Sequence, residues 1–281
     1  MTIECVPNFS EGRDPLIVNA IAQSVRDTNG ATLLDTTSDA DHNRTVLTFA
    51  GEPHAVIDAA LNAARIAVAK INLTHHTGVH PRLGALDVLP FVPLTGAMLA
   101  DCAAYAHEAG ERIWRELHVP VYFYEAAARR PECARLENVR RLAPAGLPPD
   151  IGDAPHPTAG YCVVGARKFL IAWNINLDSG DLPAAKAIAR EIRESNGGLP
   201  AVKALGLALP LRHQVQVSIN LVDFERTPLH VVFDAVATRC HARGVPIAGS
   251  ELIGMLPQAA LDASSGFDLH WLNFRPELVL A

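Results

Sequence analysis

Residues 74–94, THHTGVHPRLGALDVLPFVPL, hold the side chains best suited to chemistry. Three histidines, an arginine and a carboxylate fall in a polar segment that runs directly into an apolar one, typical of a buried strand. Side chains on a loop at the end of a strand are well placed for binding and catalysis, because a rigid scaffold holds them. We therefore expect His80, followed by Pro81 and Arg82, to lie at the centre of a functional site.

The spacing of the histidines first suggests the hypothesis of a metal site. His76 and His80 are four apart, which puts two imidazoles on one face of a helix. However, Gly78 lies between them, Pro81 would end the helix, and no carboxylate completes a familiar zinc motif. We therefore expect no metal. Two alternatives remain open from the residues alone: a surface loop that happens to contain histidines, or a general acid/base histidine, which can accept and return a proton near neutrality.

Polar residues elsewhere could complete such a site. The guanidinium of Arg82 has a fork suited to carboxylates. Asp87 could orient an imidazole or be a simple turn or cap residue. In the cluster Asp41-His42-Asn43-Arg44-Thr45, Asn43 and Arg44 could donate to a carboxylate, although aspartates there could merely satisfy turn amides.

Two further signals lie in the second half of the chain. Asn174 and Asn176 are two apart in an apolar strand and therefore share one face. Buried amides need partners, so we expect these two to serve a ligand. Residues 165–168, GARK, precede this strand as a turn, in which Arg167 and Lys168 either face an anion or are solvated.

The elements that must position these residues repeat in two halves. Apolar runs predict strands and 3.6-residue periodicity predicts helices. In the first half we expect strands at 3–9, 31–35, 44–50, 85–91 and 119–124, and helices at 14–28, 52–70 and 97–117. Residues 129–153 indicate helix fragments and a surface loop, and 150–160 a boundary or lid. In the second half we expect strands at 169–177, 202–209, 214–222 and 249–256, and helices at 183–195, 228–243 and 257–263.

Both halves thus follow the order βαββαβ, which is the ferredoxin-like arrangement of two helices on one face of an antiparallel sheet. The prediction is an α+β protein of two ferredoxin-like subdomains, residues 1–168 with His80 and residues 169–281, with a ligand cleft between their sheets.

Composition excludes several classes of protein. The chain has 281 residues and a net charge of −6, without the basic stripe of a nucleic-acid-binding protein. No apolar run approaches the roughly 20 residues of a membrane span. Five cysteines without a CxxC motif favour a reducing compartment over a disulfide framework. The N-terminus shows no secretory signal, so we expect a cytoplasmic protein.

Six stretches carry a resemblance to a known family: ECVPNFSEGR at 4–13, DHNRTVLTFAGEP at 41–53, HTGVHPRLGALDVLPFVPL at 76–94, GARKFLIAWNINL at 165–177, QVSINLVDFERTPLH at 216–230 and GSELIGMLP at 249–257. The chain resembles the formiminotransferase domain family, in the single-function form of glutamate formimidoyltransferase without the cyclodeaminase part. The resemblance implies a homodimer that transfers the formimino group from N-formimino-L-glutamate to N5 of tetrahydrofolate, the co-substrate, in histidine degradation and one-carbon metabolism.

The resemblance also implies residue roles. The catalytic histidine of the family's HPRxGALD motif falls on His80, which we expect to act as a proton shuttle, and a folate-contacting loop falls on residues 152–160. The residues expected to bind folate or the donor are Asn8, Asn43, Arg44, Arg82, Asp87, Gly152, His156, Thr158, Gly160, Arg167, Asn174 and Asn176.

This chain departs from the family pattern in places that bear on folate contact. The loop GDAPHPTAG is one residue shorter, and Thr37 stands where the family often has an aspartate. Two other functions stay open: formyl transfer between 5-formyltetrahydrofolate and glutamate, and a non-catalytic folate-binding module.

Overall fold

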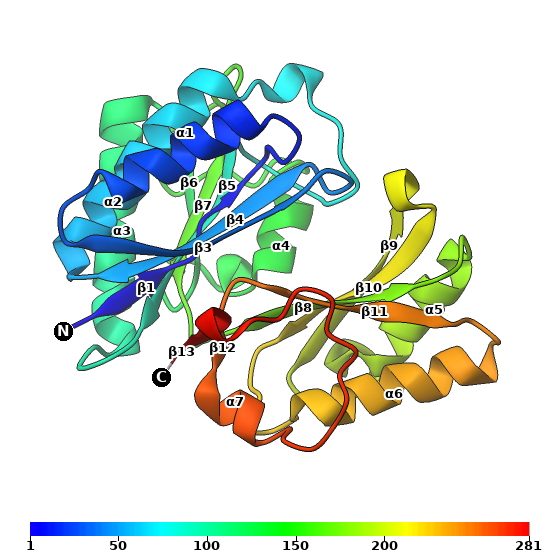
Figure 1. Ribbon diagram of the computed structural model, residues 1–281. Coiled ribbons are helices and arrows are strands. Elements are labelled where there is room, and N and C mark those ends of the chain that lie inside the picture. The colour runs from blue at the N-terminus through cyan, green and yellow to red at the C-terminus, as the bar shows by residue number, and fades with distance from the viewer. Residues whose placement is uncertain (281) are drawn as a thin grey trace. The chain divides into compact units, whose positions relative to one another are not determined.

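The computed structural model describes residues 1–280 and divides the chain into two compact units, Met1–Lys168 (unit 1) and Phe169–Ala281 (unit 2) (Figure 1). Each unit has its own sheet with helices packed on it. The predicted α+β class is therefore confirmed. Among the described residues, no helix combines the length and the apolar character needed to cross a membrane.

Unit 1 is built on a seven-stranded sheet. Its strands are β1 Ile3–Cys5, β2 Asn8–Phe9, β3 Ala31–Asp39, β4 Arg44–Gly51, β5 Leu86–Pro93, β6 Val121–Glu125 and β7 Cys162–Ala166. β3 pairs with β4, β1 and β2 both lie between β4 and β5, and all these pairings are antiparallel. Beyond β5 follow β7 and then β6, in parallel pairings.

β1 and β2 form one strand that is interrupted at Val6 and Pro7. Against β4, Glu4 pairs with Ala50 and Asn8 with Val46, so the register is the same in both pieces. Against β5 the register shifts at the end of β2, where Asn8 pairs with Val88 but Phe9 with Leu86. The extra residue is Asp87. A bulge changes the direction in which the side chain of its extra residue points. This bulge therefore explains why Asp87 breaks the alternation of side chains between the two faces of β5.

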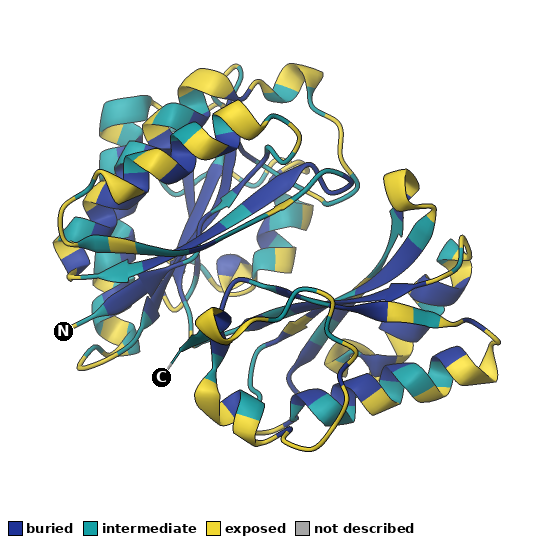
Figure 2. Ribbon diagram, in the orientation of Figure 1, coloured by how far each residue is buried: buried dark blue, intermediate teal, exposed yellow. Residues whose placement is uncertain are grey.

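The helices of unit 1 are α1 Pro15–Arg26, α2 Pro53–Lys70, α3 Leu99–Leu117 and α4 Leu136–Leu142, with 3₁₀ turns at Leu73–His75 (η1) and Pro131–Cys133 (η2). α1 begins as predicted, with Pro15 in its first turn and the Asp14 side chain accepting from the amide of Leu16. The buried sides of α1, α2 and α3 face the sheet (Figure 2) and form its main core. α4 packs through Val139 on the opposite face, against Tyr122 and Tyr124.

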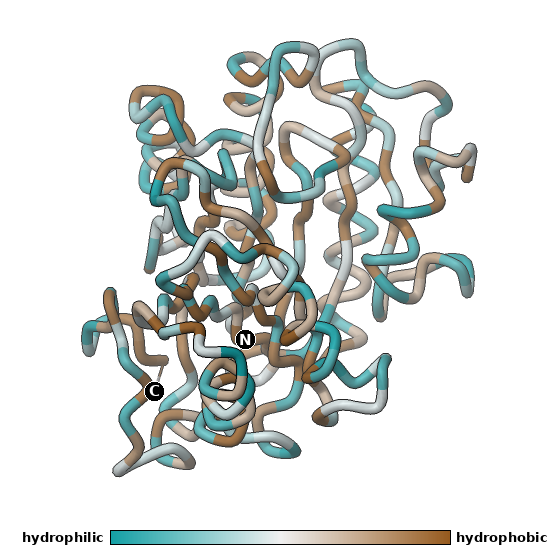
Figure 3. Tube along the Cα trace, turned by 90° about the vertical axis from the view of Figure 1, so that its right-hand side faces the viewer, coloured by the Kyte–Doolittle hydropathy of each residue, from teal (hydrophilic) through white to brown (hydrophobic). Residues whose placement is uncertain are grey.

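Unit 2 has a four-stranded antiparallel sheet in the order β11-β8-β10-β9. Its strands are β8 Ile171–Leu177, β9 Val202–Leu209, β10 Gln214–Leu221 and β11 Ile247–Ile253, and its two long helices are α5 Leu182–Ile192 and α6 Leu229–Ala242. Smaller elements follow or connect these: η3 Glu194–Asn196, η4 Pro210–Arg212, β12 Leu256–Pro257, α7 Gln258–Asp262, η5 Pro276–Leu278 and β13 Val279–Leu280. Hydrophobic and hydrophilic residues alternate along the chain, as packing on one side requires (Figure 3). The core includes fully buried Trp173, stacked on Phe233.

Most of the predicted helices and strands are present, but two expectations for unit 1 are wrong. Gly165 and Ala166 do not form a turn; they end β7, a buried strand that the sequence analysis missed. Because β7 pairs in parallel with β5 and β6, the sheet of unit 1 is also not antiparallel throughout.

Candidate functional site

The loop that carries His80 is fixed to the turn between β3 and β4 by Arg82. The Arg82 guanidinium donates to the carbonyls of His42 (2.7 Å), Asn43 (3.0 Å) and His80 (2.9 Å). Its Nη1 also lies 2.8 Å from Nε2 of His76, which must accept because arginine can only donate. All three nitrogens of Arg82 thus bind within the protein, and the side chain holds the loop in place.

Asn43 ties the same turn to two other segments. Its backbone is left-handed, with φ of 46°, a conformation that asparagine tolerates better than most residues. Its side chain accepts from the amide of Gly12 (2.9 Å) and donates to the carbonyl of Thr77 (3.0 Å). Asn43 is buried, so these bonds make it a structural anchor of the His80 loop.

His80 is half-buried, and its contacts define its tautomer. Nδ1 lies 2.8 Å from the carbonyl oxygen of Pro81. A carbonyl can only accept, so Nδ1 carries the hydrogen and Nε2 has its lone pair available in the neutral ring. Burial lowers the pKa of His80 well below its usual value, and the positive charges of Arg44 and Arg140 lower it further. The ring is therefore neutral and able to act as a base near pH 7.

Asp87 is the centre of a buried ionic cluster beside this loop. Its Oδ2 accepts from Arg44 (2.8 Å) and from Arg140 (2.7 Å), and its Oδ1 accepts from the amide of Leu83 (2.6 Å). Arg44 also donates from two nitrogens to the side-chain oxygen of Asn8 (2.8 and 3.1 Å). Burial alone would raise the pKa of Asp87, but the charges of Arg140 and Arg44 hold that pKa well below its usual value.

The cluster carries more positive than negative charge, since two arginines share one carboxylate. Arg140 lies in α4, inside the segment expected to be helix fragments and a surface loop, and the sequence analysis missed it. Its Nε is buried and has no hydrogen-bond partner among the described residues. The only signal in the sequence was a pair of arginines ending a short helical run, Arg140-Arg141. His42, which the sequence analysis names in the polar cluster but does not assign a role, places its ring centroid 5.8 Å from that of His80.

The expected folate loop meets the His80 loop at two glycines. Gly84 and Gly160 form a backbone bridge, with the amide of Ala85 donating to Ala159 (2.9 Å). A side chain on Gly84 would overlap the carbonyl of Tyr161, and one on Gly160, where φ is +67°, the carbonyl of Leu83. Glycine is therefore needed at both positions.

Within that loop, His156 and Thr158 lie close to this bridge. His156 and Gly160 bond each other through both backbone groups (2.9 and 3.0 Å). Nδ1 of His156 accepts from the amide of Ala159 (3.0 Å), so its hydrogen is on Nε2. The carbonyl of Thr158 accepts from the amide of Leu73 (2.8 Å), and its side chain lies beside the His156 ring.

Gly152 and Arg167 are placed by other parts of unit 1. Gly152, with φ of +82°, lies against Trp114 and Pro120 near the end of α3. Arg167 follows β7; its amide donates to the carbonyl of Phe91 (3.1 Å) and its guanidinium lies beside the hydroxyl of Tyr124. No contact brings either residue to His80.

Asn174 and Asn176 belong to β8 of unit 2. Their neighbours Trp173 and Ile175 are fully buried in the core, so both amides point to the other face of the sheet, as expected. The side-chain oxygen of Asn176 accepts from Gln216 (2.7 Å), another buried amide of the same face. The face opposite α5 and α6 is thus polar near the centre of the sheet.

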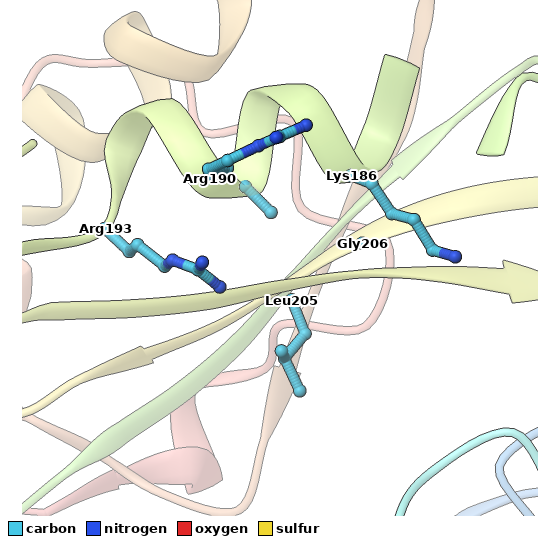
Figure 4. Close-up of a pocket in the computed structure, with 6 residues that line it drawn as sticks. Lys186, Arg190, Arg193, Leu205 and Gly206 are labelled. Carbon is cyan, nitrogen blue, oxygen red and sulfur yellow. The ribbon is translucent and has the colours of Figure 1, made fainter. Parts of the chain in front are cut away.

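Unit 2 also has a shallow pocket of about 320 Å³ where α5 crosses β9 (Figure 4). Lys186, Arg190 and Arg193 line it together with Leu205 and Gly206. A side chain on Gly206 would overlap the backbone of α5, so the absence of one lets helix and strand approach closely. None of the residues expected to bind a substrate lies in this pocket.

Among residues 1–280, no group of three or more His, Cys, Asp or Glu side chains is arranged to hold a metal ion. The expectation that the protein uses no metal stays a prediction. The arrangement is that of a candidate acid/base histidine beside a cationic cluster.

Fold and site therefore define an α+β protein with a candidate acid/base histidine, and comparison with known proteins identifies its family. Residues 2–167 match the N-terminal subdomain of the formiminotransferase domain, and residues 172–271 match the formiminotransferase domain model. The chain belongs to the formiminotransferase domain family, which confirms the predicted resemblance.

The relatives include proteins of different length. A glutamate formimidoyltransferase of Streptococcus pyogenes is 41% identical over 92% of this chain and 90% of its own length. One of Thermoplasma acidophilum is 37% identical over 92% and 89%, respectively. The formimidoyltransferase-cyclodeaminase of Sus scrofa is 42% identical over 94% of this chain but only 52% of its own length, so this chain spans about half of that relative.

Proposed function

We propose that the protein is a glutamate formimidoyltransferase, which transfers the formimino group from N-formimino-L-glutamate to N5 of tetrahydrofolate. The observation that carries the proposal is His80, a neutral histidine with Nε2 free, beside a buried cluster of positive charge. Two relatives that match this chain over nine-tenths of its length carry that enzyme's name, which supports the choice of reaction.

The reaction needs one group that takes and returns a proton. A bond forms between N5 of tetrahydrofolate and the amidine carbon of the donor, and the bond from that carbon to the glutamate nitrogen breaks. N5 loses one proton and the leaving nitrogen gains one. His80 Nε2 accepts the first proton and returns it to the second nitrogen, so the net change is zero. Such a base contributes roughly 10²–10⁴-fold, and alignment of the two substrates supplies much of the rest.

The arginines have different tasks in this proposal. Arg44 and Arg82 bind Asn8, Asp87 and backbone carbonyls with all their nitrogens, so they position the His80 loop. Arg140 has a buried Nε without a partner and lies in a site of surplus positive charge. It is the donor best suited to a substrate carboxylate.

The remaining expectations form part of the proposal. Asn8, Asn43 and Asp87 hold the site, and the other residues contact folate: Gly152, His156, Thr158, Gly160, Arg167, Asn174 and Asn176. Both units have the strand order expected of ferredoxin-like subdomains, β5-β1/β2-β4-β3 in one and β11-β8-β10-β9 in the other. The ligand cleft, the homodimer and the cytoplasmic location rest on the family resemblance and the sequence.

The experiment is a comparison of His80→Ala with His75→Ala, an exposed histidine of the same loop. Formation of 5-formiminotetrahydrofolate is followed, and tetrahydrofolate binding is measured by calorimetry. His80→Ala should lose about 10²–10⁴-fold in kcat and keep its folate affinity, whereas His75→Ala should resemble wild type. A His80→Ala protein with near-wild-type kcat would contradict the role of His80. Turnover of 5-formyltetrahydrofolate with glutamate, but not of formiminoglutamate, would contradict the proposed donor.

A further inference from the structure

Unit 1 contains a buried carboxyl group that the catalytic site does not use, that of Glu4 in β1. The neighbours of Glu4, Ile3 and Cys5, belong to the core under α1–α3. Side chains alternate along a strand, so Glu4 points to the opposite face of the sheet. Asn8, four residues on in the same continuous register, points to that face too and joins the Arg44–Asp87 cluster. The carboxyl of Glu4 thus lies roughly 13 Å along the strand from that cluster.

Two polar atoms in the adjacent strands β1 and β4 on this face have no partner among the described residues. They are Oε2 of Glu4 and the hydroxyl oxygen of Thr48, in residues that are 1% and 0% exposed. Leu47 and Phe49 lie in the main core, so Thr48 shares the face of Glu4. Because Glu4 pairs with Ala50, Thr48 is its diagonal neighbour. Buried polar atoms are almost always hydrogen-bonded, so these two adjacent oxygens are well suited to accept the hydrogen bonds of a ligand.

The surroundings of the two atoms differ: Glu4 has aliphatic neighbours, whereas Thr48 pairs with Asp35 of β3, a buried aspartate. Ala50 and Val92 flank Glu4 on the adjacent strands. Further across the sheet, Gly165 of β7 lies beneath the ring of Tyr124, and a side chain at that glycine would overlap the ring. Small aliphatic side chains beside an aromatic ring pack well against a planar heterocycle.

The charge near Glu4 limits what the missing partner can be. The guanidinium of Arg167 lies close enough to lower the pKa of Glu4, but burial outweighs it and raises that pKa to about 7. A carboxylate in this position is short of hydrogen-bond donors rather than of positive charge. A second cation bound to Glu4 would be repelled by the charge of Arg167, whereas neutral N–H donors would not be.

We propose that Glu4 binds the 2-amino-4-oxopyrimidine edge of the reduced folate ring, with its carboxylate accepting from the 2-amino group and from the adjacent ring N–H. This inference rests on the proposed function and adds a subsite for the ring to it. Two parallel N–H groups match the two oxygens of a carboxylate in the same way as the fork of arginine does. Thr48 adds a hydroxyl that can accept from or donate to the ring edge.

The test measures affinity without turnover. The dissociation constants of tetrahydrofolate and of its analogue lacking the 2-amino group are determined by calorimetry for wild type, Glu4→Gln and Glu132→Gln, the last an exposed control. Glu4→Gln keeps the shape and removes an unpaired buried charge, so the variant should fold. We expect a loss of about 10–100-fold in tetrahydrofolate affinity for Glu4→Gln and none for Glu132→Gln. The KM for formiminoglutamate should stay the same.

The analogue separates direct contact from a structural effect. Wild type should discriminate against it, and Glu4→Gln should have lost most of that discrimination. The inference is overturned if wild type binds both ligands equally, a result that needs no variant to fold. It is also overturned if Glu4→Gln discriminates as wild type does. A wild-type protein that binds tetrahydrofolate but never releases 5-formiminotetrahydrofolate would contradict the proposed function instead, and leave the subsite measurable.

Discussion

Asp87→Asn tests whether the buried ionic cluster holds unit 1 together. The substitution keeps the size of the side chain and an oxygen that can accept from the amide of Leu83. It removes the negative charge that Arg44 and Arg140 share, since both guanidinium groups bind Oδ2. Two guanidinium groups then meet in a buried site without a counter-ion.

The magnitude follows from burial. Removing one partner of a buried ion pair typically costs about 3–5 kcal/mol, because the remaining charge loses its compensation. Asp87 is 0% exposed and serves two arginines, so we expect a loss of unfolding free energy in this range. For a domain of this size, 1 kcal/mol corresponds to roughly 2–4 °C in Tm, which gives a decrease of about 6–20 °C.

The stabilisation that Asp87 provides is also pH-dependent. The pKa of Asp87 is depressed in the native state, so its contribution is present above the ordinary aspartate pKa of about 3.9 and lost as pH falls below it.

Asp58→Asn is the matched control. Asp58 forms an ion pair of similar length with Arg112 (2.7 Å), but its side chain is 52% exposed. An exposed pair contributes only about 0–1 kcal/mol. Thermal and urea unfolding of both variants, followed by circular dichroism, measure the difference. If Asp87→Asn unfolds within 1 kcal/mol of Asp58→Asn, the cluster does not have the energetic role that its burial indicates.

Two further predictions concern the base and its loop. Arg140→Gln removes one of the charges that lower the pKa of His80, so the acid limb of the pH profile of kcat/KM should move to higher pH. Arg140→Lys restores the charge and should move that limb back. An unchanged acid limb in Arg140→Gln would show that it does not report the titration of His80. Gly84→Ala forces a side chain into the carbonyl of Tyr161 and should reduce Tm by several degrees. Gly180→Ala is the control, because its side chain meets no atom within 4 Å and should leave Tm unchanged. Equal Tm values for the two variants in a thermal melt would refute the close approach of Gly84 to Tyr161.

The sequence predicted those parts of the site that depend on local signals. Polar side chains next to apolar runs point to the HPR motif and to the Arg44 cluster, and the family resemblance adds Asn8. The structure brings Asn8, Arg44 and Asp87 into direct contact. Asn174 and Asn176 share a face because alternation in a strand depends only on spacing.

What could not be predicted depends on contacts between distant residues. Arg140 is separated from Asp87 by 53 positions, and nothing local distinguishes it from neighbouring arginines that stay at the surface. β7 was missed because Gly165 looked like a turn residue. The glycine is there because the ring of Tyr124, on a strand 41 positions earlier, occupies the space of its side chain.

The role of Arg82 shows how such contacts redirect an interpretation. Its fork and its place beside His80 favoured a substrate carboxylate as partner, yet its nitrogens bind three backbone carbonyls and His76. In the proposed function, the charge for an anionic substrate comes instead from the cluster, in which two arginines share Asp87. Burial lowers the pKa of His80, and the same surplus charge lowers it further, so the ring is neutral. An anion entering the site would complete the charge balance and raise the proton affinity of His80 at the moment when the reaction needs it to accept a proton.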